Sequence, residues 1–190
     1  MNQTAGHTAL LRTLLGVLLA VVLGVPAAWA DGFKVVRAHT TTTDSVIRLD
    51  ARLEFDFTPP PLEALRNGVP LTIEVQIEVL RAREWAWDET VASVLQRYRL
   101  EYHALARQFV VFNLNSGELR SFPTRNGAIE FMGRIQDFPL LDRALLVKGG
   151  SYYGRLRTTL DIESLPPPLR PLAYLSSDWR LSSPWYAWSL

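Results

Sequence analysis

The segment Ile47–Phe57, with the sequence IRLDARLEFDF, decides the fold class. Apolar residues occupy every second position and charged residues the positions between, which is the period of a β-strand with one buried and one solvated face. The segment Thr72–Val79 repeats this pattern, with aliphatic residues separated by Glu74, Gln76 and Glu78. Such strands are typical of antiparallel sheets, because parallel strands are usually buried on both faces.

A weaker alternation over Gln96–His103 predicts a third strand. Its Arg97 and Arg99 lie on the polar face, and we expect them to pair across strands with Glu74 and Glu78. Opposite charges facing each other on neighbouring strands stabilise a sheet, so these pairs would help to fix the strand register.

Turn residues divide the rest of the chain into short elements. We predict a helix at Leu62–Arg66 closed by Asn67-Gly68, a hairpin of Gln108–Asn115 and Glu118–Phe122, a helix at Arg125–Gln136 capped by Thr124, a strand at Ser151–Ile162, and a docked final strand within Ser176–Leu190. The chain is therefore expected to be mainly β, an antiparallel β-sandwich of about seven to eight strands with two short helices. A partly closed β-barrel is the alternative.

The first thirty residues have the organisation of a secretory signal peptide. The apolar run Leu14–Val25 is shorter than the ~20 residues that a transmembrane helix needs. Pro26 ends this run, and Ala28-Trp29-Ala30 supplies small residues for a signal peptidase. We predict a signal peptide over residues 1–30, a single exported domain over residues 31–190, and cleavage before Asp31. The alternative is an uncleaved segment that anchors the protein in the inner membrane.

Composition narrows the classes of function. The chain has no cysteine, which excludes disulfides, thiol catalysis and thiolate metal sites. All 19 acidic residues follow residue 30 and one of the 20 basic residues is Arg12, so the exported part has balanced charge. Nucleic acids and anionic membrane surfaces are not expected partners, because binding to phosphate needs an excess of basic residues. Peripheral membrane contact of another kind stays open.

No familiar catalytic or cofactor motif is present. His39 and His103 are the histidines after residue 30, too few for a metal site built from imidazoles. The sequence has no His-Glu-x-x-His, no Gly-x-Ser-x-Gly and no glycine-rich phosphate loop. Asp88 and Glu89 lie beside two tryptophans, but consecutive residues of an extended chain point in opposite directions and do not share a substrate easily. We expect no catalytic residue, no metal ligand, no cofactor and no enzymatic activity.

The tryptophans allow two interpretations. Trp85 and Trp87 form one group after the predicted signal peptide, and a second group lies near the C-terminus. Tryptophan buries about 150–250 Å² in a core, so we interpret both groups mainly as core residues that close the seam between sheets. The alternative is an exposed aromatic ledge for a protein, a glycan or a membrane. The candidate partner-binding residues of this ledge are Arg180, Trp185, Tyr186 and Trp188.

The C-terminal third contains a distinctive combination of short runs. These are Tyr152-Tyr153-Gly154-Arg155-Leu156-Arg157, Leu160-Asp161, Leu165-Pro166-Pro167-Pro168-Leu169-Arg170, Asp178-Trp179-Arg180-Leu181-Ser182-Ser183 and Trp185-Tyr186-Ala187-Trp188. With them the chain resembles, over essentially all of residues 31–190, the exported proteobacterial family catalogued as domain of unknown function 4390. Pro167 and Pro168 are a small departure from its pattern.

This resemblance implies a location in the periplasm of a Gram-negative cell and proximity to a membrane sensor histidine kinase of the nitrogen-regulation type. It implies no activity and assigns no catalytic residue. We therefore expect a non-enzymatic envelope protein that binds a protein partner, such as the sensor kinase, and modulates envelope signalling. A module that binds a small molecule, lipid or glycan is the alternative, followed by an enzyme of unrecognised type.

Overall fold

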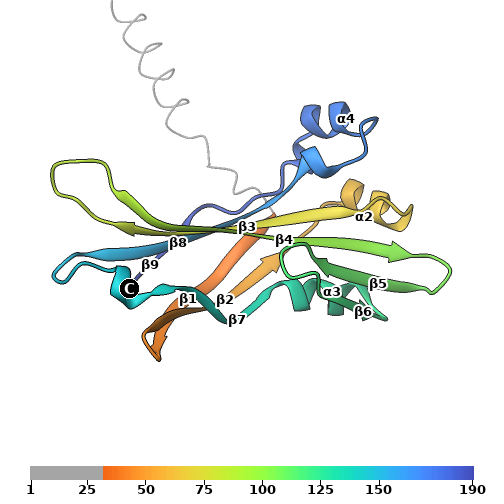
Figure 1. The fold of residues 1–190 in the computed structure, drawn as a ribbon. Helices are drawn as coiled ribbons and strands as arrows, with labels where there is room; N and C mark the ends of the chain where they lie inside the picture. The colour runs from red at the N-terminus through yellow and green to blue at the C-terminus, as the bar shows by residue number, and fades with distance from the viewer. Residues whose placement is uncertain (1–31) are drawn as a thin grey trace, which may run out of the picture. The chain divides into compact units, whose positions relative to one another are not determined.

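The computed structural model describes residues 32–190, so the predicted signal peptide lies outside the described residues (Figure 1). Within them, nine strands form two antiparallel sheets, one of three strands in the order β1-β2-β7 and one of six in the order β6-β5-β4-β3-β8-β9. The strands are β1 Phe33–Thr43, β2 Val46–Phe55, β3 Leu71–Arg81, β4 Glu89–His103, β5 Gln108–Asn113, β6 Leu119–Phe122, β7 Arg134–Asp142, β8 Tyr152–Leu160 and β9 Tyr186–Ser189.

The two sheets pack on each other around an apolar core. The apolar positions of β2, such as Leu49 and Leu53, are buried, as are Ile73, Val75 and Ile77 of β3. Each fully buried aliphatic side chain contributes about 1.5–3 kcal/mol of transfer free energy, and a shift of one residue in either strand would expose the whole set. The predicted mainly-β sandwich is confirmed, with nine strands where seven to eight were expected. The two sheets are separate, so the barrel alternative does not describe this fold.

Three short α-helices accompany the sheets where two were predicted: α2 Pro59–Arg66, α3 Arg125–Met132 and α4 Arg170–Leu175. The chain also forms three 3₁₀ turns: η1 Arg143–Leu145, η2 Ile162–Ser164 and η3 Ser177–Trp179. Helix α2 begins three residues earlier than predicted because proline suits the first turn of a helix, where no N–H partner is needed. Helix α4 was not predicted, and it also has proline in its first turn.

Helix α3 is shorter than predicted. Thr124 caps it as expected, since its Oγ1 accepts a hydrogen bond from the Gly127 N–H at 3.1 Å. The predicted continuation to Gln136 is wrong: the helix ends at Gly133, and Arg134 begins β7 beside β2. The sequence did not indicate β7 as a strand because its register is irregular, with Asp137 in a left-handed conformation (φ 49°).

One of the two predicted cross-strand ion pairs is present and the other is not. Arg97 contacts Glu74 at 3.0 Å, as expected. Arg99 pairs instead with Glu101 at 2.8 Å on its own strand. Glu78 pairs with Arg155 at 2.6 Å, because β3 lies between β4 and β8 and Arg155 is the residue opposite Glu78 on the β8 side.

Residues Asp31–Leu190 group into one compact unit. Among residues 32–190, no helix combines the length and the apolar character that crossing a bilayer requires.

Candidate functional site

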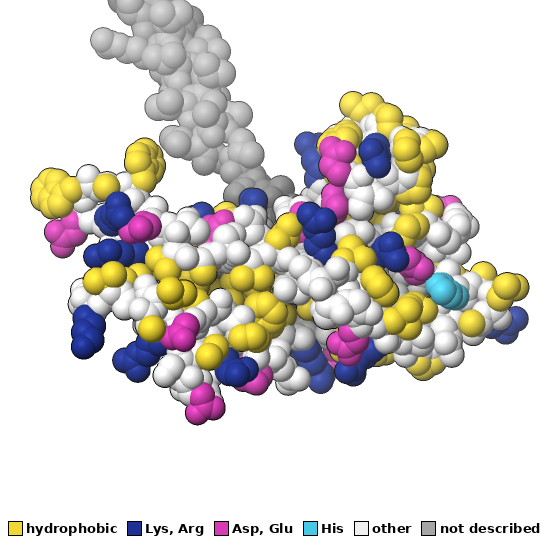
Figure 2. Space-filling view, viewed as in Figure 1, with side chains coloured by type: hydrophobic (Ala, Val, Ile, Leu, Met, Phe, Trp, Pro, Cys, Tyr) yellow, Lys and Arg dark blue, Asp and Glu magenta, His cyan; other side chains and the backbone are white. Residues whose placement is uncertain are grey.

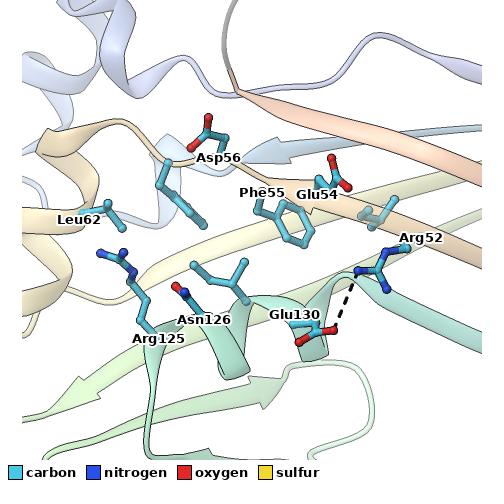
Figure 3. Close-up of a pocket in the computed structure, with 11 residues that line it drawn as sticks. Arg52, Glu54, Phe55, Asp56, Leu62, Arg125, Asn126 and Glu130 are labelled. Carbon is cyan, nitrogen blue, oxygen red and sulfur yellow. Dashed lines mark ion pairs between the residues drawn. The ribbon is translucent and has the colours of Figure 1, made fainter.

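A groove of about 510 Å³ lies between the end of β2 and the first turns of α3 (Figure 3). One wall is Arg52–Phe57, from β2 and the residues that follow it. The other wall is formed by Arg125, Asn126, Ile129 and Glu130 of α3, and Leu62 of α2 closes one end. The groove thus forms where β2 continues beyond its partner β7 and the chain on that side is helical instead of extended.

The backbone of β2 is open toward this groove. Leu53 donates its N–H to the Gly133 carbonyl at 2.8 Å on the β7 side, whereas Asp56 donates to Gly32 at 3.3 Å on the β1 side. Backbone groups of a strand alternate in direction, so the N–H and C=O of Phe55 point the same way as those of Leu53. Pairing with β7 ends at Arg134, and within residues 32–190 no hydrogen bond joins Phe55 to α3. Phe55 therefore offers an unpaired donor and acceptor to the groove.

The aromatic side chains next to this open edge pack tightly against one another. Phe33 contacts Phe55 and Phe57 edge to face, with ring centroids 4.9 Å and 5.1 Å apart. All three rings are buried in the core. Edge-to-face pairs add about 0.5–1.5 kcal/mol to the free energy gained by burying the rings. This packing holds the backbone of the open edge in place.

Charges of both signs surround the groove. Arg52 and Glu130 face each other across it at 3.9 Å (Figure 3). Glu54, Asp56 and Arg125 form no ion pair within the part of the chain that the structure describes. Since an unpaired charge at a surface is free to bind a charge on a ligand, the rim suits a ligand with both acidic and basic groups.

The four candidate residues of the predicted aromatic ledge do not lie on one surface. The Trp185 ring lies on the outer face of the six-stranded sheet, 4.4 Å from the guanidinium carbon of Arg155 and 4.6 Å from that of Arg157. Tyr186 and Trp188 pack against the core, and Arg180 is exposed at the end of η3. Alternation along a strand separates Trp185 from Tyr186 and Trp188, which is a signal that the sequence spacing already contained.

Trp188 is tightly seated on β8. A side chain at Gly154 would come within 2.3 Å of the Trp188 ring, so only glycine allows this contact. The Trp188 indole nitrogen is buried and has no hydrogen-bond partner within residues 32–190. Trp179 is also buried in the core. The interpretation of the C-terminal tryptophans as core residues therefore holds for Trp179 and, in large part, for Trp188.

The same interpretation is wrong for Trp85 and Trp87. Both indoles are almost fully exposed, at 96% and 95%, on the loop Ala82–Asp88 that joins β3 to β4. The two neighbouring carboxylates have different partners: Asp88 accepts from the Tyr153 hydroxyl at 2.6 Å, and Glu89 pairs with Arg83. They do not converge on a shared substrate position.

The Asp88–Tyr153 contact shifts both groups. The hydrogen bond from Tyr153, together with one from the Arg83 N–H, lowers the pKa of Asp88 below its ordinary 3.8. The same bond, and to a smaller extent burial, raises the pKa of Tyr153 above its ordinary 10.0. The contribution of Asp88 to stability is present above pH 3.8 and is lost as pH falls through the lower folded pKa. That of Tyr153 is present below pH 10.0 and is lost as pH rises through the higher folded pKa.

Substituting Tyr153→Phe is expected to return the pKa of Asp88 toward 3.8, because the phenol hydroxyl is the main donor to this carboxylate. The measurement is an NMR titration of the aspartate side chains in the wild type and the variant. Tyr152→Phe is the matched control, since the Tyr152 hydroxyl donates nothing to Asp88 and instead accepts from the Val147 N–H. An unchanged Asp88 titration in Tyr153→Phe would contradict the contact.

Residues 32–190 contain no group of three or more His, Asp or Glu side chains arranged to hold a metal ion. The groove between β2 and α3 combines open backbone, apolar walls and unpaired charges. A second cavity, of about 910 Å³, lies beside the segment between β7 and β8 and is lined by residues such as Ile47, Val147 and Tyr152. Sequence reasoning missed the groove because it depends on where β7 stops alongside β2. The one local signal is Gly133, which permits the close approach of the two segments.

Comparison with known proteins adds one finding. No curated protein and no solved structure matches the chain. The family model described as a domain of unknown function, DUF4390, matches residues 30–189, which includes both sheets, the groove and the tryptophan-bearing loop. The resemblance noted in the sequence is confirmed by this match, and the chain belongs to the DUF4390 family.

Proposed function

We propose that this chain is a non-enzymatic protein of the periplasm that holds an extended segment of a protein partner in the groove between β2 and α3. The observation that supports this proposal is the open backbone of Phe55, which faces the groove beyond the end of β7. A peptide lying beside Leu53–Phe57 would add a strand at this edge, with main-chain hydrogen bonds giving affinity. Side chains of the peptide would give specificity through the two walls.

The walls indicate which sequence the groove prefers. Leu62 and Ile129 offer apolar surface, whereas Asp56 and Arg125 offer unpaired charges of opposite sign. Successive side chains of an extended peptide point to opposite sides. The expected segment therefore alternates apolar residues with charged ones of both signs.

The partner that we propose is the extracytoplasmic part of a membrane sensor histidine kinase, whose signalling the bound protein would modulate. This choice rests on the family resemblance and on the predicted signal peptide, which would bring the chain into the same compartment. Binding of an extended segment suits a regulatory role, because segments that become ordered on binding are common in signalling interactions.

A photo-crosslinking residue at Asn126, inside the groove, tests the proposal in envelope preparations. A crosslinker at Thr43 is the matched control, since Thr43 lies at the other end of the β1–β2 hairpin. Capture of a sensor kinase from Asn126 and not from Thr43 is the expected outcome. Equal capture from both positions would contradict binding in the groove.

With the captured kinase domain purified, filling the groove is expected to block binding. Asn126→Trp should weaken the affinity by at least about tenfold, because the indole occupies the space of one or two peptide side chains. Thr43→Trp should leave the affinity unchanged. Isothermal titration calorimetry measures both, and thermal unfolding of each variant excludes misfolding. Equal affinities for Asn126→Trp and the wild type would refute the groove as the site.

A second candidate is binding of a small molecule, since 510 Å³ falls in the size range of ligand pockets, about 300–1,000 Å³. Native mass spectrometry of protein taken directly from the envelope would show a retained ligand of defined mass. Loss of that ligand in Asn126→Trp would favour this candidate over the peptide.

A further inference from the structure

The loop Ala82–Asp88 presents two indoles to solvent at one end of the six-stranded sheet. Trp85 and Trp87 are 96% and 95% exposed. Tryptophan is the side chain with the most apolar surface, about 150–250 Å² when buried, so full exposure of two of them is costly in water. A large apolar surface kept exposed in this way marks a contact with another phase or molecule.

The loop is held in place at its base. The Ala82 N–H donates to the Ser151 carbonyl at 2.9 Å, and the Tyr153 hydroxyl donates to Asp88 at 2.6 Å. Arg83 pairs with Glu89. These contacts engage Asp88 and Glu89, whereas Glu84, beside Trp85, is exposed and forms no ion pair within residues 32–190. The two indoles project beyond the paired carboxylates from a fixed hairpin.

A second apolar loop lies at the same end of the sheet. The segment between β7 and β8 exposes Leu145 and Val147, at 64% and 56%, and it reaches β8 directly beside the β3–β4 hairpin, where Arg81 pairs with Tyr152. Figure 1 shows both loops at the left end of the sandwich, and Figure 2 shows hydrophobic side chains projecting there with basic and acidic side chains close by. Arg143 and Lys148 of the second loop are exposed.

The exposure of the two indoles decides between classes of ligand. Neither tryptophan lines the groove beside β2 or the cavity of about 910 Å³ beside the β7–β8 segment, so the two indoles do not form the wall of a recess for a small ligand. Hot-spot tryptophans of protein interfaces are surrounded by a ring of packed surface, which a narrow hairpin tip does not provide. The interface of a lipid bilayer accepts protruding indoles without a preformed pocket, and it places nearby Arg and Lys at the level of the phosphates.

We propose that the tip Trp85–Trp87 inserts into the interface of a lipid bilayer, with Leu145 and Val147 entering beside it. This contact depends on the indoles and not on net charge, so it is compatible with a charge-balanced chain. It is separate from the groove, because none of these four residues lines the groove. The protein would bind its partner while held at the membrane surface.

The absence of cysteine allows a direct test in the full-length chain. Ala86→Cys, between the two tryptophans, and Ala104→Cys each receive a nitroxide label. They are matched, because both are exposed alanines on hairpin turns at opposite ends of the 15-residue strand β4. Each is mixed with phosphatidylcholine vesicles, and electron paramagnetic resonance measures the access of a lipid-soluble and a water-soluble relaxant.

The label at residue 86 is expected to become accessible to the lipid-soluble relaxant, while that at residue 104 stays in water. Adding Trp85→Ser and Trp87→Ser should reduce the lipid-accessible fraction at residue 86 by about tenfold or more, given the apolar area removed. A label at residue 86 that stays in water on vesicle-bound protein would overturn the proposal. The proposal would also be overturned if the label at residue 86 became buried in a complex with a soluble protein and not on vesicles.

Discussion

Replacing Gly133 with alanine is expected to lower the free energy of unfolding by about 1–3 kcal/mol, the cost of forcing extra atoms into a packed site. A Cβ at this position would lie 2.4 Å from the Leu53 carbonyl oxygen. That oxygen belongs to the backbone, so no change of rotamer can relieve the clash. The junction between α3 and β7 must move away from β2, and the hydrogen bond from Leu53 to Gly133 should be lost. Chemical denaturation and hydrogen exchange at Leu53 measure the two effects.

Gly127→Ala is the matched control, because it makes the same substitution inside α3, of which Gly133 is the C-cap. Its Cβ would meet only side chains, the nearest being Thr124 Oγ1 at 3.1 Å, and alanine is favoured over glycine in a helix by about 1 kcal/mol. We expect it to change the stability by less than Gly133→Ala does. Equal effects at the two positions would show that Leu53 does not constrain Gly133.

Replacing Gly154 with alanine is expected to displace Trp188 and loosen β9, with a loss of about 1–3 kcal/mol. The new Cβ would lie 2.3 Å from the Trp188 ring, which rests on β8 opposite Gly154. Strand β9 has four residues and pairs with β8 alone, so within residues 32–190 no second strand holds its backbone by hydrogen bonds. Hydrogen exchange of Tyr186–Ser189 and a red shift of tryptophan fluorescence measure its release.

A double-mutant cycle tests this cause. In the background of Trp188→Ala the ring is gone, so adding Gly154→Ala should then cost much less than it does in the wild type. Such a lack of additivity is expected only for residues in contact. If the two losses simply add, the clash with Trp188 is not the reason for the effect of Gly154→Ala.

The strands β2 and β3 could be predicted because the sequence of each alternates apolar and polar residues. In β3 the neighbouring strands bury part of the polar face as well, including Glu78. Strands β1 and β7 could not, since irregular register at Val35/Arg37 and around Asp137 breaks the period. A bulge adds one residue and reverses the facing of all later side chains. The end of α3 was misjudged for a related reason, because Gly133 is stabilised by contact with a strand eighty residues earlier in the chain.

The candidate sites were less accessible to prediction than the fold. Trp85 and Trp188 are the same residue type, and what separates them is whether a neighbouring strand lies opposite: Gly154 lies under Trp188, whereas the β3–β4 loop extends beyond its neighbours. The groove depends on the relative ends of β2 and β7, which is a property of long-range pairing. Neither can be derived from local periodicity.

The open edge at Phe55 also bears on self-association. An exposed strand edge is a template for pairing with a second copy of the same chain. Antiparallel pairing centred on Phe55 would place Glu54 of one copy opposite Asp56 of the other, twice. Like charges directly opposite each other destabilise a sheet. The acidic residues that flank Phe55 therefore keep the protein from blocking its own edge, and a segment with basic residues at those positions has the advantage.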